Sequence, residues 1–271
     1  MSQVVTKAFV MNSFPWKDRH RLLHLLTPDL GLITAMAPAS ERLKSRLRPV
    51  TQLFSYSEFT LTCQQSRFSV KDGSLIESFI SISRDLDRLA AASHAAEVFS
   101  DAARNDQPQR NLFELWGYTL YEIAVAEDPV FIARMGTFRL MKVMGLLPCL
   151  DSCLICREAI DGPLLFSFRE GGLLCGRDLD AAAGERLTSL SPGCGALLRH
   201  IANAPLTRLY RFQASEAVRH EASCFAERWL EEKMEKRYKR LAMLDQCPDF
   251  ILPEQRLPHE EKDHDSLSQP L

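Results

Sequence analysis

Two pairs of possible metal ligands lie close together in the sequence: Cys153-Leu154-Ile155-Cys156, and Cys175 with Asp178 in Gly171-Gly172-Leu173-Leu174-Cys175-Gly176-Arg177-Asp178. Eighteen residues separate Cys156 from Cys175, a spacing typical of two tight turns that close around one zinc ion. The intervening segment from Gly162 to Gly172 has the pattern of a small hairpin. The sequence therefore predicts a zinc knuckle with Cys153, Cys156, Cys175 and Asp178 as ligands.

The fourth ligand is the unusual member of this set. Asp178 stands where a cysteine or histidine is expected, and a carboxylate is a harder ligand than zinc usually takes in structural sites. Cys149 is an alternative fourth ligand. A redox pair and a knuckle held by packing without metal also stay open. A catalytic zinc is not expected, because no His or Glu with hydrolase spacing lies nearby.

Helical periodicity surrounds the knuckle. Apolar residues recur with a period of 3.6 from Arg84, and Asn105-Asp106-Gln107-Pro108 ends the first helix. A second helix capped by Asn111 and a third over about 130–144 precede the knuckle. Two more helices, over about 192–202 and 215–242, follow it. We predict a helical domain over 81–244 with the knuckle inserted at 149–178. The basic residues expected in the final turns suit the helix dipole: Lys233, Lys236, Arg237, Lys239 and Arg240.

Residues 1–80 have β patterning instead. About five short strands, the last of them Arg67–Val70 and Ser74–Ser78, are separated by turns such as Thr27-Pro28-Asp29-Leu30-Gly31 and predict a small barrel of the OB type. The fold class is therefore α+β, with an N-terminal OB-fold β-barrel followed by an α-helical domain that carries the zinc-knuckle insertion. Proline and charge predict a disordered tail over 245–271.

Charge is concentrated in one loop of the predicted barrel. The first 80 residues hold ten Lys or Arg against six Asp or Glu, although the whole chain has a net charge of −2. Within the segment Ala39–Pro49, Arg42, Lys44, Arg46 and Arg48 alternate with Leu or Ser. Such a run is often only a solvated loop, but loops around an OB barrel are where single strands bind, so phosphate contact is predicted here.

Three aromatic residues of the barrel could offer faces on which bases stack: Phe54, Tyr56 and Phe59. Aromatic residues at such positions are more often part of the core, so no single one is selected.

The composition excludes several classes of protein. Hydrophobic residues make up 46% and charged residues 25%, as in ordinary soluble globular proteins. No apolar run reaches eighteen residues and the N-terminus has no apolar signal region, so neither a membrane protein nor a secreted one is expected. Eight cysteines are too few for a secreted disulfide scaffold and indicate a reducing cytoplasm.

The order of barrel, helices, knuckle and long final helix resembles the RecO family of bacterial DNA repair proteins, to about residue 242. Several stretches carry the resemblance in their order and spacing: Asp18-Arg19-His20-Arg21-Leu22-Leu23, Thr27-Pro28-Asp29-Leu30-Gly31, Ser45-Arg46-Leu47-Arg48-Pro49, Leu75-Ile76-Glu77-Ser78-Phe79, Arg84-Asp85-Leu86-Asp87-Arg88-Leu89-Ala90, and Cys153 with Cys156 and Phe166-Ser167-Phe168-Arg169-Glu170-Gly171-Gly172-Leu173-Leu174-Cys175. Asp178 departs from the cysteine usual in zinc-bearing members, which puts zinc occupancy in question but not the family.

The resemblance implies a recombination mediator that is not an enzyme. Members bind single- and double-stranded DNA, anneal complementary strands, and work with RecR to load RecA onto strands coated by single-strand binding protein, SSB. It also implies a cytoplasmic, nucleoid-associated protein. Arg42, Lys44, Arg46 and Arg48 are the first choice for sequence-independent DNA contact. The second choice for DNA contact is another basic cluster, which consists of Lys17, Arg19 and Arg21.

The family also docks the acidic, Phe-ended tail of SSB on its helical domain. The third helix offers apolar and basic residues for such a pocket, although an amphipathic helix with a solvated face explains the same pattern. The apolar residues are Phe131, Met135 and Phe138, and the basic ones are Arg134, Arg139 and Lys142.

Two other functions compete with this interpretation. A nuclease or ligase-like enzyme is disfavoured, because the chain has no paired carboxylates at metal spacing, no P-loop and no reactive-lysine motif. A zinc-knuckle adaptor that binds proteins and carries an incidental barrel is the alternative, and the basic loop discriminates it from a DNA-binding protein.

Overall fold

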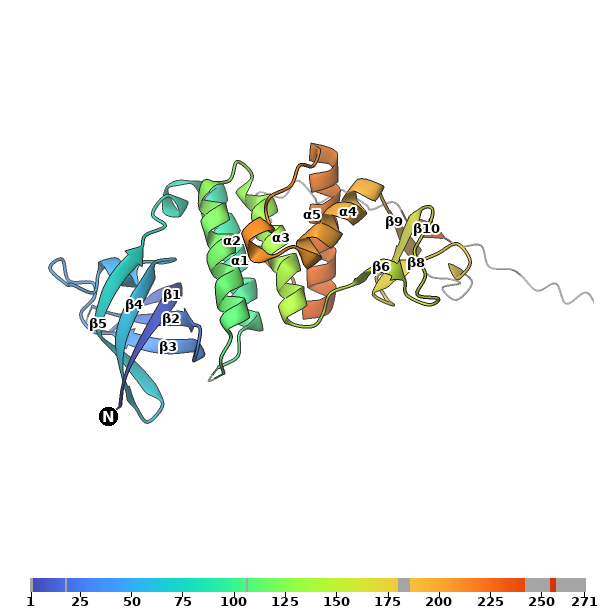
Figure 1. The fold of residues 1–271 in the computed structure, drawn as a ribbon. Coiled ribbons are helices and arrows are strands. Elements are labelled where there is room, and N and C mark those ends of the chain that lie inside the picture. The colour runs from blue at the N-terminus through green and yellow to red at the C-terminus, as the bar shows by residue number, and fades with distance from the viewer. Residues whose placement is uncertain (1, 18, 106, 180–185, 242–253, 257–271) are drawn as a thin grey trace, which may run out of the picture. The chain divides into compact units, whose positions relative to one another are not determined.

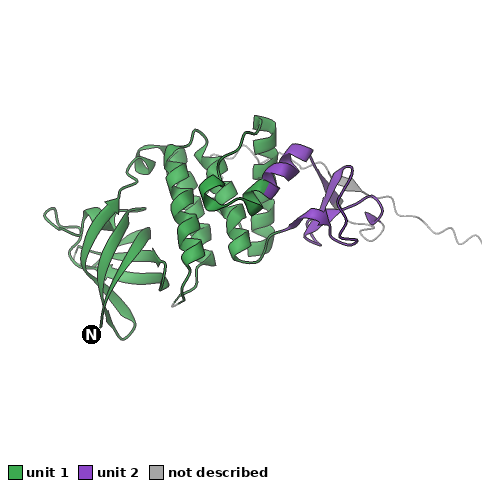
Figure 2. Ribbon diagram, in the orientation of Figure 1, with its two compact units in different colours: residues 1–147, 200–249 green, residues 148–199, 250–271 purple. Residues whose placement is uncertain are grey.

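The computed structural model describes residues 2–17, 19–105, 107–179, 186–241 and 254–256 (Figure 1). The chain divides into two compact units, Met1–Leu147 with His200–Asp249 and Pro148–Arg199 with Phe250–Leu271 (Figure 2). The first unit holds a β-barrel and most of the helices, and the second holds a small sheet. The α+β fold class is thereby confirmed. Among the described helices, none combines the length and apolar character needed to cross a bilayer.

The N-terminal strands close into a barrel in the order β1-β2-β3-β5-β4. Closure depends on a parallel pairing of β3 with β5, in which Ala35 lies opposite Phe68. A closed barrel leaves no free strand edge, and five strands in this arrangement confirm the OB-like prediction. The strands are β1 (Ser2–Trp16), β2 (His20–Thr27), β3 (Gly31–Ala37), β4 (Tyr56–Gln64) and β5 (Arg67–Glu77).

One strand differs from its prediction. The stretches Arg67–Val70 and Ser74–Ser78 were expected as two strands, but the structure has the single strand β5. Thr60 of β4 pairs with Asp72, whereas the next residue Leu61 pairs with Val70, so Lys71 is an extra residue in β5. A β-bulge of this kind interrupts the period of two, which is why the sequence pattern looks like two strands.

The barrel core follows from alternation along the strands. In β3, Ile33, Ala35 and Ala37 are buried and Thr34 between them is exposed, because successive side chains point to opposite faces. The same inward set continues around the barrel and includes two residues of the segment between β3 and β4. The core consists of Ala8, Val10, Leu23, Leu25, Ile33, Ala35, Ala37, Leu47, Val50, Phe59, Leu61 and Val70.

The helices of the first unit pack around α3. This helix contacts α1, α2 and α5, and eleven of its fifteen residues are buried, as expected for a central helix. The predicted inward residues Phe131, Met135 and Phe138 are among them. The predicted cap Asn111 is wrong, because Asn111 lies inside α2 and Gln109 precedes the helix. The helices are α1 (Leu86–Ala102), α2 (Arg110–Val125), α3 (Pro129–Val143), α4 (Pro192–Asn203) and α5 (Glu216–Met234), with short 3-10 turns at Pro49–Thr51, Ile82–Arg84, Leu206–Arg208 and Lys239–Leu241.

The last helix ends earlier than predicted. Helix α5 stops at Met234, because Glu235 adopts a left-handed conformation with φ 50°. The chain then turns toward α1, where the Lys236 ammonium lies 2.7 Å from Asp101 Oδ2 and the Tyr238 hydroxyl donates to the same carboxylate at 3.0 Å. Arg240 donates to a Glu97 carboxylate at 2.6 Å. Lys236 and Arg240 therefore pair with acids of α1, Arg237 lies 3.8 Å from Glu231 of α5, and none of these three residues lies in the last turns of α5.

The barrel and the helices of the first unit meet at the turn between β2 and β3. Gly31 has φ +67°, and a Cβ added there would lie 2.1 Å from the carbonyl oxygen of Arg104. The amide of Leu32 donates to that carbonyl at 3.3 Å, and the amide of Gln109 donates to Pro28 O at 2.9 Å. Only glycine allows so close a contact at this conformation, so the turn is fixed against the α1–α2 connection.

Aromatic packing reinforces this contact. The Phe9 ring stacks on Tyr56 at 4.4 Å between centroids and meets Phe113 of α2 at 5.0 Å. The Phe54 ring lies 6.3 Å from Trp116 of the same helix. Aromatic pairs of this geometry contribute more than their buried area alone.

The second unit contains a five-stranded sheet in the order β10-β9-β7-β8-β6. The predicted insertion at 149–178 covers three of its strands, and two further strands join the same sheet. The prediction of a disordered tail over 245–271 falls largely outside the described residues, but its described part, Glu254–Arg256, is a strand paired with β9. The strands are β6 (Cys149–Cys153), β7 (Leu164–Ser167), β8 (Gly172–Leu174), β9 (Arg186–Leu190) and β10 (Glu254–Arg256).

Candidate nucleic-acid interface and metal centre

The segment between β3 and β4 is anchored to the barrel at its far end. Leu47 and Val50 belong to the barrel core and are 8% and 2% exposed. The Ser55 hydroxyl donates to Val50 O at 2.9 Å, and Ser40 at the other end donates to Ala37 O at 3.1 Å. These contacts hold a segment without regular strands against the end of the barrel.

Between these anchors the four predicted cations lie on the surface. Arg42, Lys44, Arg46 and Arg48 are all exposed, and none forms an ion pair within the described part of the chain. The nearest acid in the sequence, Glu41, is engaged elsewhere, because its carboxylate lies 3.0 Å from Nη1 of Arg21. The loop therefore presents positive charge that its own acids do not neutralise.

The second cluster lies on the hairpin between β1 and β2, and its members differ. Lys17 and Arg19 are exposed at the turn. Arg21 is half-buried: its Nε donates to Ser13 Oγ at 2.7 Å and its Nη2 to Ser13 O at 2.9 Å, besides the pair with Glu41. Arg21 thus ties the hairpin to the neighbouring loop and, contrary to its grouping with the other two, is not free to contact phosphate.

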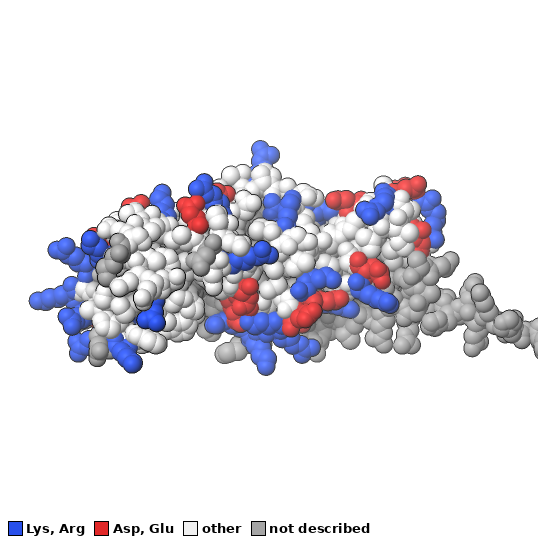
Figure 3. Space-filling view, turned by 90° about the horizontal axis from the view of Figure 1, so that it is seen from below, with Lys and Arg blue, Asp and Glu red and all other residues white. Residues whose placement is uncertain are grey.

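The hairpin and the loop form one surface. The amide of Glu41 donates to Arg19 O at 3.1 Å, and the amide of Ala39 donates to His20 Nδ1 at 2.7 Å. Seen from below, Lys and Arg side chains gather over the barrel end of the molecule with few acids among them, at the left of Figure 3. We call the following residues the cationic rim: Lys17, Arg19, Arg42, Lys44, Arg46 and Arg48.

The aromatic residues considered for base stacking lie in packed positions. Phe54 and Phe59 are 2% and 0% exposed, and the Tyr56 ring is covered on one side by Phe9. The Phe54 and Phe59 rings therefore present no open face of the kind that stacking requires, and Phe9 occupies one face of the half-buried Tyr56. The core alternative is the one that the structure supports.

The predicted zinc ligands come together in the second unit. The ligand atoms of Cys153, Cys156, Cys175 and Asp178 all lie within 4.8 Å of one another. Asp178 Oδ2 is 3.1 Å from each of the Cys153 and Cys175 sulfurs, and the Cys156 and Cys175 sulfurs are 3.7 Å apart. Three thiols and a carboxylate at this spacing fit a tetrahedral divalent ion.

Two backbone turns create this cluster. Arg157 is left-handed with φ 63°, and its amide donates to Cys153 O at 3.0 Å, which closes the turn after β6. The amide of Asp178 donates to Cys175 O at 3.1 Å and closes the turn after β8. Hydrogen bonds from the Cys175 and Cys153 thiols lower the pKa of Asp178 to about 2, so this carboxylate carries the charge that a metal ligand needs.

The alternative fourth ligand lies outside the cluster. Cys149 lies at the start of β6, where its sulfur is 3.6 Å from Ser152 O. It does not belong to the cluster of Cys153, Cys156, Cys175 and Asp178. Asp178 is therefore the fourth member of this cluster, and the residues present could hold a metal ion.

The three basic residues predicted to surround a pocket on α3 are engaged inside the protein. Arg134 is 5% exposed, and its Nη2 lies 2.7 Å from a Glu227 carboxylate on α5. Arg139 donates to Ile201 O at 2.8 Å and to Ala204 O at 2.9 Å, and Lys142 donates to Ala202 O. The predicted rim of Arg134, Arg139 and Lys142 is therefore wrong: two of the three satisfy carbonyl groups around the end of α4, and the third holds α3 against α5.

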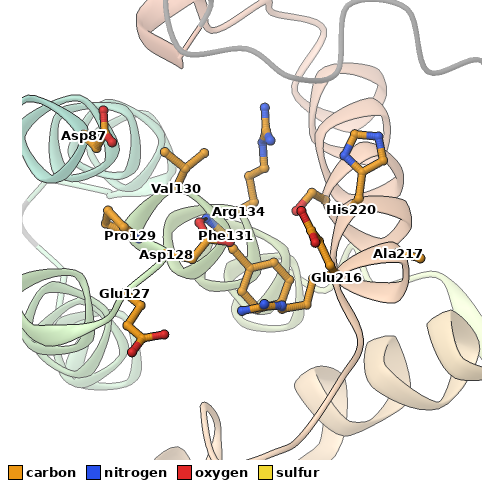
Figure 4. A pocket seen from close by; sticks show the side chains of 12 residues that line it. Asp87, Glu127, Asp128, Pro129, Val130, Phe131, Arg134, Glu216, Ala217 and His220 are labelled. Atoms are coloured by element: carbon orange, nitrogen blue, oxygen red, sulfur yellow. Dashed lines mark hydrogen bonds between the residues drawn. The ribbon is translucent and has the colours of Figure 1, made fainter.

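A cavity of ≈ 740 Å³ lies at the N-terminal ends of α3 and α5 (Figure 4). The view shows Asp87 of α1, Val130 and Phe131 of α3, and His220 of α5 around it. Four carboxylates and two guanidinium groups line it, so an acidic ligand meets no net positive charge there. Its charged residues are Asp87, Glu127, Asp128, Arg134, Glu216 and Arg219, with His220 beside them.

Two aromatic residues of the first hairpin are not among the predicted site residues. Phe14 and Trp16 are 42% and 50% exposed at the end of β1. The sequence does contain a signal for them: Phe14 and Trp16 flank Pro15 and come directly before the basic residues Lys17 and Arg19.

Comparisons with known proteins agree along most of the chain. The family model "Recombination protein O N terminal" matches residues 1–79, and "Recombination protein O C terminal" matches residues 83–242. A DNA repair protein RecO of Acetivibrio thermocellus is 31% identical over 242 residues, 89% of this chain and 96% of the relative. The protein of that name from Desulforamulus reducens is 29% identical over 240 residues, 88% and 92% of the two chains. That of Listeria innocua is 30% identical over 174 residues, 64% and 68%.

Proposed function

The chain belongs to the recombination protein O family, and from this premise we propose that it is a DNA-binding mediator of DNA repair and recombination. It binds single- and double-stranded DNA and anneals complementary strands. The observation that carries the proposal is the cationic rim, six exposed basic side chains without acidic partners in the described chain. DNA is the polyanion that such a surface suits best.

Annealing requires two polyanions to approach each other. Each phosphate that meets a lysine or arginine releases condensed counterions, and this release lowers the repulsion between the strands. The rim offers side-chain charge and no rigid groups aimed at base edges, so binding is independent of sequence. Because the loop is anchored in the barrel core through Leu47 and Val50, it is already ordered before DNA binds. Binding therefore costs less conformational entropy than it would for a disordered segment.

The proposed partners are RecR, together with which the protein helps to load RecA onto SSB-coated strands, and the C-terminal tail of SSB. No basic pocket on α3 supports the second of these, because Arg134, Arg139 and Lys142 bind groups of the protein itself. The proposal of SSB as a partner therefore rests on family membership. The protein is further proposed to act without catalysing a reaction.

Substitution of four rim residues tests DNA binding. Replacing Arg42, Lys44, Arg46 and Arg48 by alanine is expected to weaken binding to every sequence and to make its salt dependence shallower. Each phosphate contact that is lost reduces the slope of log K against log salt by about 0.9 for duplex and about 0.7 for single strands. The affinity for labelled oligonucleotides is measured by fluorescence anisotropy across a salt series.

A matched variant controls for net charge. Three arginines and one lysine in the helical part are also exposed, and replacing them by alanine removes the same charge: Arg208, Arg211, Arg237 and Lys239. This control is expected to keep the wild-type salt slope. Equal slopes in all three proteins would overturn the proposal and favour a zinc-knuckle adaptor that binds proteins. Turnover of ATP or cleavage of DNA by the purified protein would contradict the absence of catalysis.

The four-residue cluster is proposed to hold Zn²⁺. Cys153, Cys156, Cys175 and Asp178 would bind it, and the ion would supply folding free energy to a small sheet and take no part in chemistry. Thiolate ligands favour zinc over the hard cations that carboxylates alone would select.

Metal analysis of the purified chain tests the zinc proposal. About one zinc per chain is expected, lost in Cys175→Ser and retained in Cys149→Ser, because Cys149 lies outside the cluster. Circular dichroism of each variant reports whether the chain still folds. A folded wild-type chain without metal would show that packing alone holds the knuckle.

A further inference from the structure

The inference concerns the two exposed aromatic residues at the end of β1. Trp16 is 50% exposed and Phe14 is 42% exposed, whereas the chain's other tryptophans, Trp116 and Trp229, are 0% and 2% exposed. Phe14 meets the His24 ring edge-on at 5.5 Å. Among the described residues, Trp16 makes no ring contact and no side-chain hydrogen bond. The packing of the barrel therefore does not account for this indole.

The two rings lie on one face of the strand. Phe14 and Trp16 are two residues apart in β1, so their side chains point to the same side. Their partners on β2 are Leu22 and His20. Ser13 and Arg21, which point to the other side, hold the loop that carries the rim.

Trp16 is followed directly in the sequence by Lys17, the first cation of the rim. The amide of Glu41 donates to Arg19 O at 3.1 Å, so the turn lies against the start of the Arg42–Arg48 loop. An aromatic face beside a track of cations is the arrangement with which proteins bind single strands: cations follow the phosphates while a base stacks on the ring.

We propose that Trp16 is a stacking site for an unpaired nucleic-acid base, with Phe14 as a second, weaker face. This inference rests on the proposed DNA-binding function and deepens it. It assigns the contact by which the protein binds single-stranded DNA more tightly than duplex DNA. In a duplex each base is already stacked and paired, so the indole gains a partner only from single-stranded DNA. Stacking does not read sequence, so any base serves.

The test uses the intact chain, oligo(dT), a duplex of the same length, and a strand of equal length with abasic sites in place of bases. Trp16→Ala is expected to bind oligo(dT) about tenfold more weakly, within the range for loss of one stacked base. Binding to the duplex and to the abasic strand is expected to be unchanged, because both interactions depend on phosphate contacts. The salt slope should equal that of the wild type.

Two further variants make the result specific to the ring. Trp16→Phe retains a π face and should recover most of the affinity for oligo(dT). Leu43→Ala shortens an apolar side chain that is 86% exposed within the rim and should change nothing. Intrinsic fluorescence provides a direct signal: oligo(dT) should quench the wild-type emission and leave Trp16→Phe unquenched, because Trp116 and Trp229 are buried.

The two proposals fail in different ways. If the wild type binds DNA with a steep salt slope but Trp16→Ala binds oligo(dT) as tightly as the wild type, the stacking site is overturned and the DNA-binding function stands. An equal loss on the abasic strand would also overturn stacking, because no base is present there. If the wild type binds neither strand nor duplex at low salt, the proposed function itself is overturned.

Discussion

The cationic rim and the basic residues of α3 carry the same kinds of side chain in different surroundings. In the rim, Arg42 to Arg48 project from a loop whose apolar residues are anchored in the barrel. On α3, Arg134 is buried against Glu227 and Arg139 donates to carbonyl groups around the end of α4. A basic residue is therefore available to a ligand only where the fold supplies no internal acceptor for its hydrogen bonds.

Removal of Arg134 would be the most severe test of this contrast. Arg134→Ala removes the guanidinium from a mostly buried ion pair with Glu227, and loss of one partner from a buried pair costs about 3–5 kcal/mol. The free energy of unfolding, measured by urea denaturation, should fall by that order. The double variant Arg134→Met with Glu227→Gln removes both charges and should recover much of the loss. A loss under about 1 kcal/mol would show that the pair is not structurally important.

Acid should destabilise the folded chain through the buried His94. Burial, together with the charge of Arg134, lowers the pKa of His94 to about 4 from its ordinary 6.5, so the unfolded chain takes up a proton more readily than the folded one. The contribution of neutral His94 to the free energy of unfolding is complete above pH 6.5. It is lost as the pH falls toward 4, and the loss amounts to about 3 kcal/mol at most. Unfolding curves measured from pH 7 to 4 check this.

A variant that cannot titrate isolates the histidine. His94→Leu should show a shallower dependence of unfolding free energy on pH over this range than the wild type. The same slope in both proteins would assign the acid sensitivity to other groups.

Neutralising the rim should have the smallest effect on stability. Alanine at Arg42, Lys44, Arg46 and Arg48 removes exposed cations without ion pairs, so the free energy of unfolding should change by less than about 0.5 kcal/mol. Relief of repulsion between neighbouring cations offsets part of any loss in stability. Thermal unfolding measured beside the DNA affinity checks this. A loss of several kcal/mol would show that these residues hold the loop in place.

Local pattern was sufficient for the barrel, the helices of the described residues, and the cluster of three cysteines and one aspartate. The turn ending at Gly31, the alternation in β3, and the paired spacings of Cys153 with Cys156 and Cys175 with Asp178 are features of neighbouring residues. Strand and helix periods and the geometry of knuckle turns act over a few residues, so a single sequence contains them.

Distant contacts were not accessible in the same way. Arg139 and Lys142 look like a solvated helical face, but carbonyl groups about sixty residues later accept their hydrogen bonds. Lys236 and Arg240 match the last turns of a longer final helix in the sequence, but they follow the end of α5 and pair with acids of α1, more than 130 residues earlier. The exposure of Trp16 likewise depends on which of the barrel's aromatic residues the helices cover. Only the assembled fold determines these outcomes.

The fixed turn at Gly31 bears on how the barrel can be studied. Excising residues 1–80 as a separate fragment would leave Leu32 N and Pro28 O without their partners Arg104 and Gln109. It would also uncover the rings of Phe9 and Phe54, which α2 shields in the intact chain. A newly wetted aromatic surface promotes self-association. Truncation is therefore a poor route to the DNA contacts, and single-residue changes in the full polypeptide are the sound one.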